Sequence, residues 1–290
     1  MTTNNKEYET PTAIILADQS LDEGLKAIFG ETEKSSLIIA GHSVIDHLLM
    51  ELRDLNFKQC IILAKESAQY LQEKLGKTKR WGMTITVMEL SISKEQVLRE
   101  YKSMSEPHGL LVFEMDRLRN HCVQDFLDKA SVCEYSLVEG VSSGNRSGIT
   151  LLKNTSADFI INAMPIELEQ LRMTSLATVR DFHQANFAVV SGLYAGLEPS
   201  VQHNTRFGRR QHWASRVHKS SNLIEQDLMI ERRCQIGRKA TLESVILNHD
   251  VFIEHNALLE NTIVMSNSVV SNQQPIRNAI VNDGVVFQVH

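Results

Sequence analysis

The sequence has no apolar run that approaches the ~20 residues of a membrane-spanning helix, and its first ten residues are polar rather than signal-like. A net charge of −5 and a pI near 6.1 argue against a general nucleic-acid or membrane-surface binder. Cysteine is scarce, and its spacing fits neither a metal site nor a disulfide framework. We therefore expect a cytoplasmic protein with reduced thiols, no membrane span and a disordered tail at residues 1–10. The four cysteines are Cys60, Cys122, Cys133 and Cys234.

What the chain does have is enough apolar sequence for one large domain or two smaller ones, with 42% hydrophobic and 22% charged residues among 290. In its first half, apolar runs alternate with segments of helical spacing, which predicts a mostly parallel, three-layer α/β sheet. Ligands bind such sheets beyond the carboxyl ends of the strands, here in the loops after Ala17 and Phe113. Strands are expected at 12–17, 58–64, 84–90 and 109–113, and helices at 44–55 and 66–75.

The middle of the chain is strand-like from Cys133 to Ile161, around a Gly/Ser-rich turn at 142–148. Helices are expected at 165–172 and 179–190. Residues 200–216 have little periodicity and carry a basic cluster. The cluster could clamp a phosphate or nucleotide, or it could be a solvated linker whose arginines contact the acidic body of the protein. Its arginines are Arg206, Arg209, Arg210 and Arg216.

In the last quarter of the chain, aliphatic residues return every six positions. A period of six is neither helical nor a strand alternation. It predicts a coil of short parallel strands in which each flat side turns one aliphatic residue toward the axis. Small or polar residues between them are expected at the corners; the alternative is a run of short antiparallel strands. The aliphatic series is Ile230, Ile236 and Leu242, then, after a five-residue step, Leu247, Ile253, Leu259 and Met265; the corner candidates are Gly237, Asn248, Asn256 and Asn261.

Three segments resemble the nucleotide-sugar pyrophosphorylases, the sugar-1-phosphate nucleotidyltransferases. TAIILA (Thr12–Ala17) resembles the first strand of that family. AGHSVIDHLLMELRDLNFKQCIILA (Ala40–Ala64) is similar to the family's AGKPLIEYVLEAL…GI…IVV stretch, and TVRDFHQANFAVV (Thr178–Val190) to its TPEDYLKANLALL. The resemblance spans Thr12 to about Val270. It implies an α/β fold, with a Rossmann-like three-layer nucleotidyltransferase domain at 11–199, a linker at 200–216 and a short left-handed parallel β-helix of hexapeptide repeats at 217–290.

The resemblance also implies a chemistry, in which a sugar-1-phosphate attacks the α-phosphate of a nucleoside triphosphate and pyrophosphate leaves. Positioning and charge neutralisation supply most of the rate of such a transfer. The family uses a glycine-rich GGxGTRL loop, the lysine of a PKP motif and two aspartates that hold Mg²⁺. Here the loop after the first strand lacks glycine, and Glu23 stands where the family has arginine. That exchange turns attraction for a phosphate into repulsion.

The remaining catalytic positions are also altered. Lys34 matches the PKP lysine, but Glu33 and Ser35 replace both prolines. Asp116 matches the first metal aspartate, and Ser175 replaces the second. A single carboxylate rarely makes a dedicated Mg²⁺ site, so Asp116 is a weak metal candidate. No cofactor is expected, and Mg²⁺ would be needed only by an active enzyme.

These departures favour a catalytically degenerate protein that binds a nucleotide or nucleotide-sugar. Such a protein would act as a regulatory or scaffold subunit in polysaccharide or glycoconjugate synthesis. The degenerate catalytic positions are Asp18, Gln19, Glu23 and Ser175, and the ligand-binding candidates are Ala17, Asp18, Gln19, Lys34 and Asp116.

Two other hypotheses remain open. One is an active nucleotidyltransferase whose phosphate contacts come from Lys26, Lys34 or the arginine cluster. The other is a hexapeptide-repeat acyltransferase, because His249 and His255 lie six residues apart and would stack on neighbouring coils.

Assembly is expected in every case, because the open end of a short coil exposes strand edges. The apolar tail from Ile276 to His290 could cap that end or pair with a second chain. We expect a dimer through the coil, and hetero-assembly with an enzyme of glycan synthesis is a further possibility.

Overall fold

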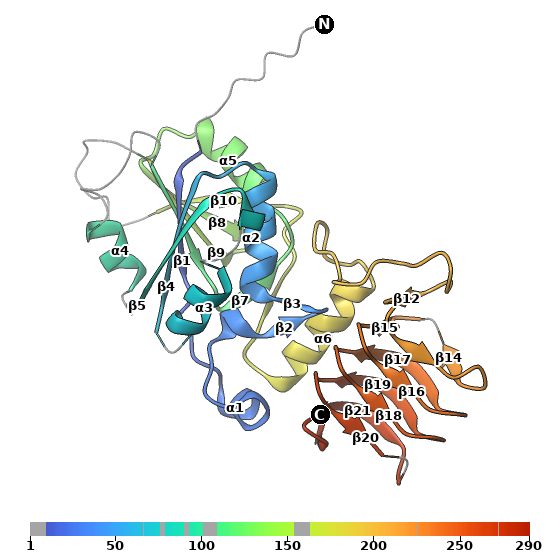
Figure 1. The fold of residues 1–290 in the computed structure, drawn as a ribbon. Helices are drawn as coiled ribbons and strands as arrows, with labels where there is room; N and C mark the ends of the chain where they lie inside the picture. The colour runs from blue at the N-terminus through green and yellow to red at the C-terminus, as the bar shows by residue number, and fades with distance from the viewer. Residues whose placement is uncertain are drawn as a thin grey trace, which may run out of the picture. The chain divides into compact units, whose positions relative to one another are not determined.

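The protein folds into two compact units, each with its own parallel strands (Figure 1). The first contains the described residues up to Ser20 together with 31–36 and 44–173; the second contains 21–30, 37–43 and 174–290. The predicted ranges are contiguous, whereas these units are interleaved along the chain. The computed structural model describes residues 10–65, 67–75, 79–89, 93–100, 109–153, 163–224, 226–271 and 273–290. The predicted tail at 1–9 and the predicted strand residues 154–161 lie outside them.

A seven-stranded sheet forms the centre of the first unit. All neighbouring strands are parallel except β9, which runs antiparallel to both β6 and β8. The mostly parallel α/β sheet predicted from the sequence is therefore confirmed. The strands lie in the order β10-β8-β9-β6-β1-β4-β5. Their bounds are β1 (Thr12–Leu16), β4 (Gln59–Ala64), β5 (Thr84–Glu89), β6 (Leu110–Glu114), β8 (Leu137–Ser142), β9 (Asn145–Leu152) and β10 (Met164–Glu167).

Helices cover both faces of this sheet, with α2 on one side and α4 on the other (Figure 1). On the α4 face, Val97 packs with Ile14 and Val112 in one buried apolar cluster. The helices of the unit are α2 (Val44–Asp54), α3 (Ala68–Leu75), α4 (Lys94–Glu100) and α5 (Val123–Ser131), with short 3₁₀ turns η1 (Lys34–Ser36) and η2 (Lys79–Trp81).

The helix predicted at 165–172 is wrong. Residues 164–167 form β10, which pairs in parallel with β8, and Pro165 lies opposite Glu139. An edge strand tolerates proline because one of its sides needs no N–H donor. Strand pairing, which is a long-range interaction, decides the structure of this segment over its local spacing. Two short strands lie outside this sheet, β7 (Arg117–Arg119) and β11 (Met173–Ser175).

The second unit contains the predicted helix at 179–190 as α6 (Val179–Val190), which is confirmed. Thr178 and Asp181 form a reciprocal capping box at its start. It also contains α1 (Glu23–Phe29) and a hairpin of β2 (Ile38–Ile39) and β3 (His42–Ser43). Both turn residues, Ala40 and Gly41, have positive φ, and the Ala40 N–H donates to Asn186 Oδ1 of α6 (2.8 Å).

The rest of the second unit is a three-sided coil of parallel strands. Residues paired across neighbouring rungs are 19 apart in the first rung and 17 apart afterwards, as in Arg216↔Gln235↔Phe252↔Val269. Each long strand bends at a residue of positive φ, such as Ser244. The strands are β12 (Arg210–Gln211), β13 (Arg216–Val217), β14 (Asn222–Ile224), β15 (Met229–Ile230), β16 (Gln235–Ile236), β17 (Thr241–Leu247), β18 (Phe252–Ile253), β19 (Leu258–Val264), β20 (Val269–Val270), β21 (Ile276–Asn282) and β22 (Val285–Gln288).

The predicted aliphatic series fills the core of the coil as far as Leu259. The next core position is Val264 rather than Met265. Successive core positions within a rung are six, six and five residues apart, and the prediction included only the first of the two five-residue steps. Among the predicted corner residues, Asn256 and Asn261 have positive φ, whereas Gly237 and Asn248 do not. Gly237 is needed for space, since a Cβ there would lie 2.7 Å from the His255 backbone nitrogen.

His249 and His255 do not stack on neighbouring rungs, contrary to the acyltransferase hypothesis. Across the rungs the Asn267 N–H donates to the His249 carbonyl, and the Asn256 N–H donates to the Arg238 carbonyl. Residues six apart in sequence therefore lie on adjacent sides of the same rung, whereas residues 17 apart lie above one another on neighbouring rungs.

The end of the coil is closed by a hairpin. β22 pairs antiparallel with β21 through a turn at Asp283 and Gly284, so the apolar tail joins its own sheet. No helix in the described ranges is long and apolar enough to cross a membrane. All four cysteines have free thiols, and burial raises the pKa of Cys60 to about 12.

Candidate functional site

The strand order of the seven-stranded sheet indicates where a ligand would bind in the first unit. From β1 the chain moves to β4 and β5 on one side and then returns to β6 on the other side. Ligands of open α/β sheets bind beyond the carboxyl ends of the strands at such a reversal. The two segments there are 17–20 after β1 and 115–119 after β6. They are adjacent, because the Met115 N–H donates to the Leu16 carbonyl (3.2 Å).

The segment after β1 is held by the chain's own residues 33–35. The Lys34 N–H donates to the Gln19 carbonyl (2.8 Å), and the Ser35 hydroxyl donates to the Ala17 carbonyl (3.3 Å). Ser20 and Glu33 form an antiparallel bridge. None of residues 17–20 has positive φ, so this segment lacks the left-handed turn residues of a glycine-rich phosphate-cradling loop.

Glu33 has a structural role that the sequence did not predict. Its carboxylate is buried and accepts hydrogen bonds from the Lys65 N–H (2.8 Å) and the Ser67 hydroxyl. Ser67 directly precedes α3, so Glu33 connects the end of β4 to the start of that helix. A buried carboxylate is stable only where donors surround it. Glu33 is therefore part of the packing of this unit.

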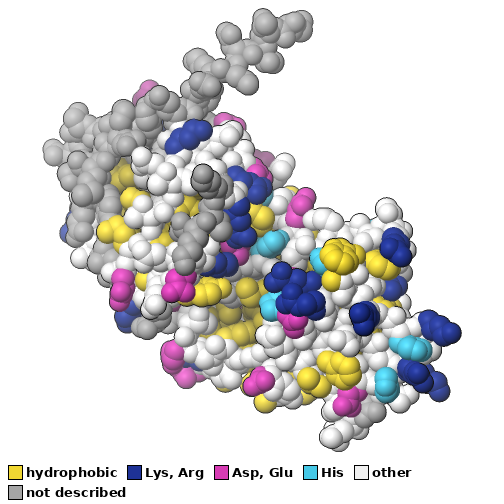
Figure 2. Space-filling model, viewed as in Figure 1, with side chains coloured by type: hydrophobic (Ala, Val, Ile, Leu, Met, Phe, Trp, Pro, Cys, Tyr) yellow, Lys and Arg dark blue, Asp and Glu magenta, His cyan; other side chains and the backbone are white. Residues whose placement is uncertain are grey.

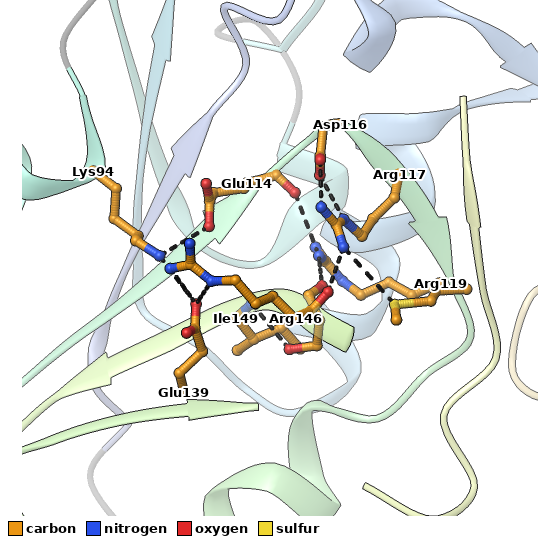
Figure 3. A network of polar contacts seen from close by, with 10 residues as sticks. Lys94, Glu114, Asp116, Arg117, Arg119, Glu139, Arg146 and Ile149 are labelled. Atoms are coloured by element: carbon orange, nitrogen blue, oxygen red, sulfur yellow. Dashed lines mark hydrogen bonds and ion pairs between the residues drawn. The ribbon is translucent and has the colours of Figure 1, made fainter. Parts of the chain in front are cut away.

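Asp116 lies after β6, and its carboxylate is bound by the neighbouring Arg117. Arg117 Nε donates to Asp116 Oδ1 (2.6 Å) and Nη2 donates to Oδ2, which makes a two-point ion pair (Figure 3). Arg117 Nη1 also donates to the carbonyl of Arg146. The hydrogen bond to Asp116 raises the pKa of Arg117. The one carboxylate that matched a metal ligand is thus neutralised by a resident cation.

Beside this pair lies a second set of ion pairs (Figure 3). Lys94 Nζ, at the start of α4, bonds to Glu114 Oε2 (3.1 Å) and to Glu139 Oε1 (3.0 Å). Arg146 of β9 bonds to the same Glu139 oxygen at 2.8 Å. The Lys94 side chain is only 8% exposed, whereas that of Arg146 is 58% exposed. Arg146 is therefore the most accessible cation of this set.

Arg119 is the buried cation of the site. Its Nη1 donates to the Ser147 carbonyl (3.1 Å), and its guanidinium lies 5.3 Å from the centre of the Phe113 ring. Burial lowers its pKa. Gly148, with φ +74, passes so close that a Cβ would lie 3.2 Å from Arg119 Nη1. Only glycine combines that backbone conformation with that approach.

Together the edge holds four cationic and three acidic side chains, and each carboxylate is bonded to at least one cation. The exposed part of such a network can attract an anion. Sequence reasoning found Asp116 but not the rest of this network, whose members come from four separate segments and share no local motif. Within the described ranges, no cluster of three or more His, Cys, Asp or Glu residues could hold a metal ion.

Other predicted site residues belong to the second unit. Glu23 lies in the first turn of α1 and is 95% exposed, with Lys26 Nζ 3.7 Å away. Ser175 ends β11. In the arginine cluster, Arg210 Nη2 donates to the Val190 carbonyl at the end of α6 (3.3 Å), and Arg209 Nε donates to Gln211 (2.9 Å). These two arginines therefore have structural contacts, while Arg206 and Arg216 are exposed.

Comparison with known proteins assigns no family. No model of a protein family matches this chain, and no curated protein matches it significantly. Its function must therefore be inferred from the chemistry of the site.

Proposed function

We propose that this chain is a catalytically degenerate nucleotidyltransferase-like protein that binds a nucleotide or nucleotide-sugar without a metal. It would serve as a regulatory or scaffold subunit in polysaccharide or glycoconjugate synthesis. The proposal includes the finer fold, a Rossmann-like nucleotidyltransferase domain followed by a left-handed parallel β-helix. The reversal of strand order beside β1 and the three-sided rungs of 17 residues support it.

The observation that carries the proposal is the two-point ion pair between Asp116 and Arg117. A nucleotidyl transfer needs cations that neutralise the charge developing on the phosphates. Mg²⁺ binds through carboxylate oxygens, and here a guanidinium contacts both oxygens of the available carboxylate. A phosphate approaching this edge would meet the fixed cations Arg117 and Arg146 in place of a metal.

The segment after β1 supports the same conclusion. Backbone N–H groups wrap a triphosphate only where the loop can adopt turn conformations. No residue of this segment has positive φ, and its carbonyls accept bonds from Lys34 and Ser35. Binding of a nucleotide without activation of its α-phosphate is the chemistry that this geometry favours.

Calorimetric titration of the whole chain tests the proposal. The ligands are nucleoside triphosphates, nucleotide-sugars and cyclic dinucleotides, each in EDTA and in excess Mg²⁺. We expect at least one of them to bind with the same affinity in both buffers. Triphosphate binding only in Mg²⁺ would favour an active enzyme, and no binding by any ligand would remove the nucleotide site and leave a scaffold.

A further inference from the structure

Positive charge is concentrated in one short part of an acidic chain. Residues 201–240 contain nine Lys and Arg against three Asp and Glu, a formal net charge of +6, whereas the whole chain carries −5. The other residues therefore carry −11. This segment forms the first two rungs of the coil. The negative charge of the whole chain, from which we expected no nucleic-acid binding, is an average that does not show the positive charge of this segment.

The register of the coil aligns residues of this segment in two columns, one of which contains an aromatic ring above a cation and the other two cations. At one corner Trp213 and Arg232 occupy equivalent positions on neighbouring rungs. The strand pairs on either side of this corner, Gln211↔Ile230 and Arg216↔Gln235, are both 19 residues apart, as are Trp213 and Arg232. At the next corner Lys219 precedes Arg238 in the same way, because Asn222 pairs with Thr241. Neighbouring rungs lie about 4.8 Å apart. We call the surface formed by Trp213, Arg216, Lys219, Arg232, Arg238 and Lys239 the polybasic face.

The cations of this face are available to a ligand. All five are exposed, and in the described part of the chain none of them makes an ion pair. Arg233 shows the contrast, because it forms a two-point ion pair with Asp250. Figure 2 likewise shows Lys, Arg and His side chains gathered at the coil's outer edge, where few carboxylates lie.

An exposed aromatic ring accompanies these charges. The side chain of Trp213 is 76% exposed, which is unusual for so large an apolar group. Its ring lies 5.5 Å from that of His212. Cations that follow a phosphate backbone, combined with an aromatic face on which a base can stack, are the two elements of single-strand binding surfaces.

We propose that the polybasic face binds single-stranded nucleic acid. A single strand brings phosphates for the cations of this face and planar bases, one of which can stack on the indole of Trp213. A duplex keeps its bases stacked inside and offers the indole no free ring. An acidic protein or glycan would match the charges, but neither supplies a flat aromatic ring at every unit.

Trp213 itself provides the readout, because the second tryptophan, Trp81, is buried. The whole chain is titrated with oligo(U) and oligo(dT) of about ten nucleotides, within the range of single-strand site sizes. Fluorescence quenching and the anisotropy of labelled oligonucleotide are followed at several salt concentrations. We expect quenching on binding, and a log–log salt dependence of about −0.7 for each phosphate contact.

Three variants separate stacking from charge. Trp213→Ala should weaken binding by about ten-fold, as for a lost stacked base, and should abolish quenching while the salt dependence remains. The double variant Arg232→Ala/Arg238→Ala should weaken binding and reduce the salt slope. Lys58→Ala/Arg180→Ala removes the same charge from exposed positions elsewhere and should leave binding nearly unchanged. Thermal unfolding verifies that each variant is folded.

Four results would overturn the proposal: no binding at low salt, equal weakening by the two double variants, no Trp213 quenching on binding, or equally tight binding of heparin and polyphosphate. The last would identify a general anion surface. None of these results concerns the nucleotide site beside β6. The single-strand proposal and the nucleotide proposal can therefore fail independently of each other.

Discussion

Arg117 and Asp116 are adjacent in sequence, and so are Arg53 and Asp54, yet the two pairs differ in geometry. Arg117 contacts both oxygens of a carboxylate that is about two-thirds buried. Arg53 contacts a single oxygen of Asp54, at 2.7 Å, and both side chains are largely exposed. Exposed pairs of this kind contribute ~0–1 kcal/mol. The second pair is therefore a natural control for the first.

Arg117→Ala is expected to convert metal-independent ligand binding into Mg²⁺-dependent binding. The substitution removes the resident cation and frees both Asp116 oxygens for a metal. Nucleotide affinity should fall at least ten-fold in EDTA and recover partly in Mg²⁺, as measured by calorimetry. Arg53→Ala should behave like the unaltered chain. Equal affinities of the Arg117→Ala variant and the unaltered chain in EDTA would show that Arg117 does not hold the ligand.

Glu33→Ala is expected to destabilise the fold. It leaves the donors at Lys65 and Ser67 without their buried acceptor, which costs about 1–3 kcal/mol for each unsatisfied group. Urea unfolding measures the effect. Glu23→Ala, which removes a 95% exposed carboxylate, should stay within about 0.5 kcal/mol of the unaltered chain. Similar unfolding midpoints for the two variants would contradict the role given to Glu33.

At the scale of elements, Glu51 connects α2 to the start of α5. Its carboxylate accepts from the N–H groups of Cys122 (2.7 Å) and Val123 (2.8 Å), which have no partner within their own helix. Burial raises the pKa of Glu51, although His121, the two N–H donors and Arg119 oppose the shift. The folded state therefore favours the protonated carboxyl more than the unfolded state does.

This raised pKa predicts how stability changes with pH. The contribution of Glu51 is fully present below its unfolded pKa of 4.5, and it declines as the pH rises from there through the raised folded pKa. Glu51→Gln lacks this titration. The free energy of unfolding of the unaltered chain, minus that of the variant, should fall as the pH rises above 4.5 in urea titrations. A difference that stayed constant or rose would contradict the direction of the shift.

Elements with strong local signals were predictable from the sequence. α6 has its helical spacing and the capping residue Thr178, and the core series of the coil was found as far as Leu259. β10 and the ion pairs of Glu139 with Lys94 and Arg146 were not predictable, because pairing with β8 and contacts between distant segments leave no local pattern. Met265 was predicted in place of Val264 because the sequence shows only one five-residue step before Leu259. A second such step is needed to recognise that the steps repeat every 17 residues.

At the scale of the whole molecule, β22 is an edge strand, with Val285 and Val286 more than 40% exposed. It pairs with β21 on one side, and an open strand edge favours pairing with another chain. We expect a dimer through this end of the coil in sedimentation equilibrium at micromolar concentration. Val286→Lys should shift the protein toward monomer, whereas Ile224→Lys, at an exposed position on β14, should not. A monomer in the unaltered chain would rule out this assembly.

Pyrophosphate release by the unaltered chain tests the central claim most directly. The protein is incubated in Mg²⁺ with each nucleoside triphosphate and a panel of sugar-1-phosphates, beside an active nucleotidyltransferase as the positive control. A site whose metal carboxylate is occupied by Arg117 should release no pyrophosphate above the protein-free blank. Mg²⁺-dependent release that Asp116→Asn abolishes would contradict this account and identify the chain as a working enzyme.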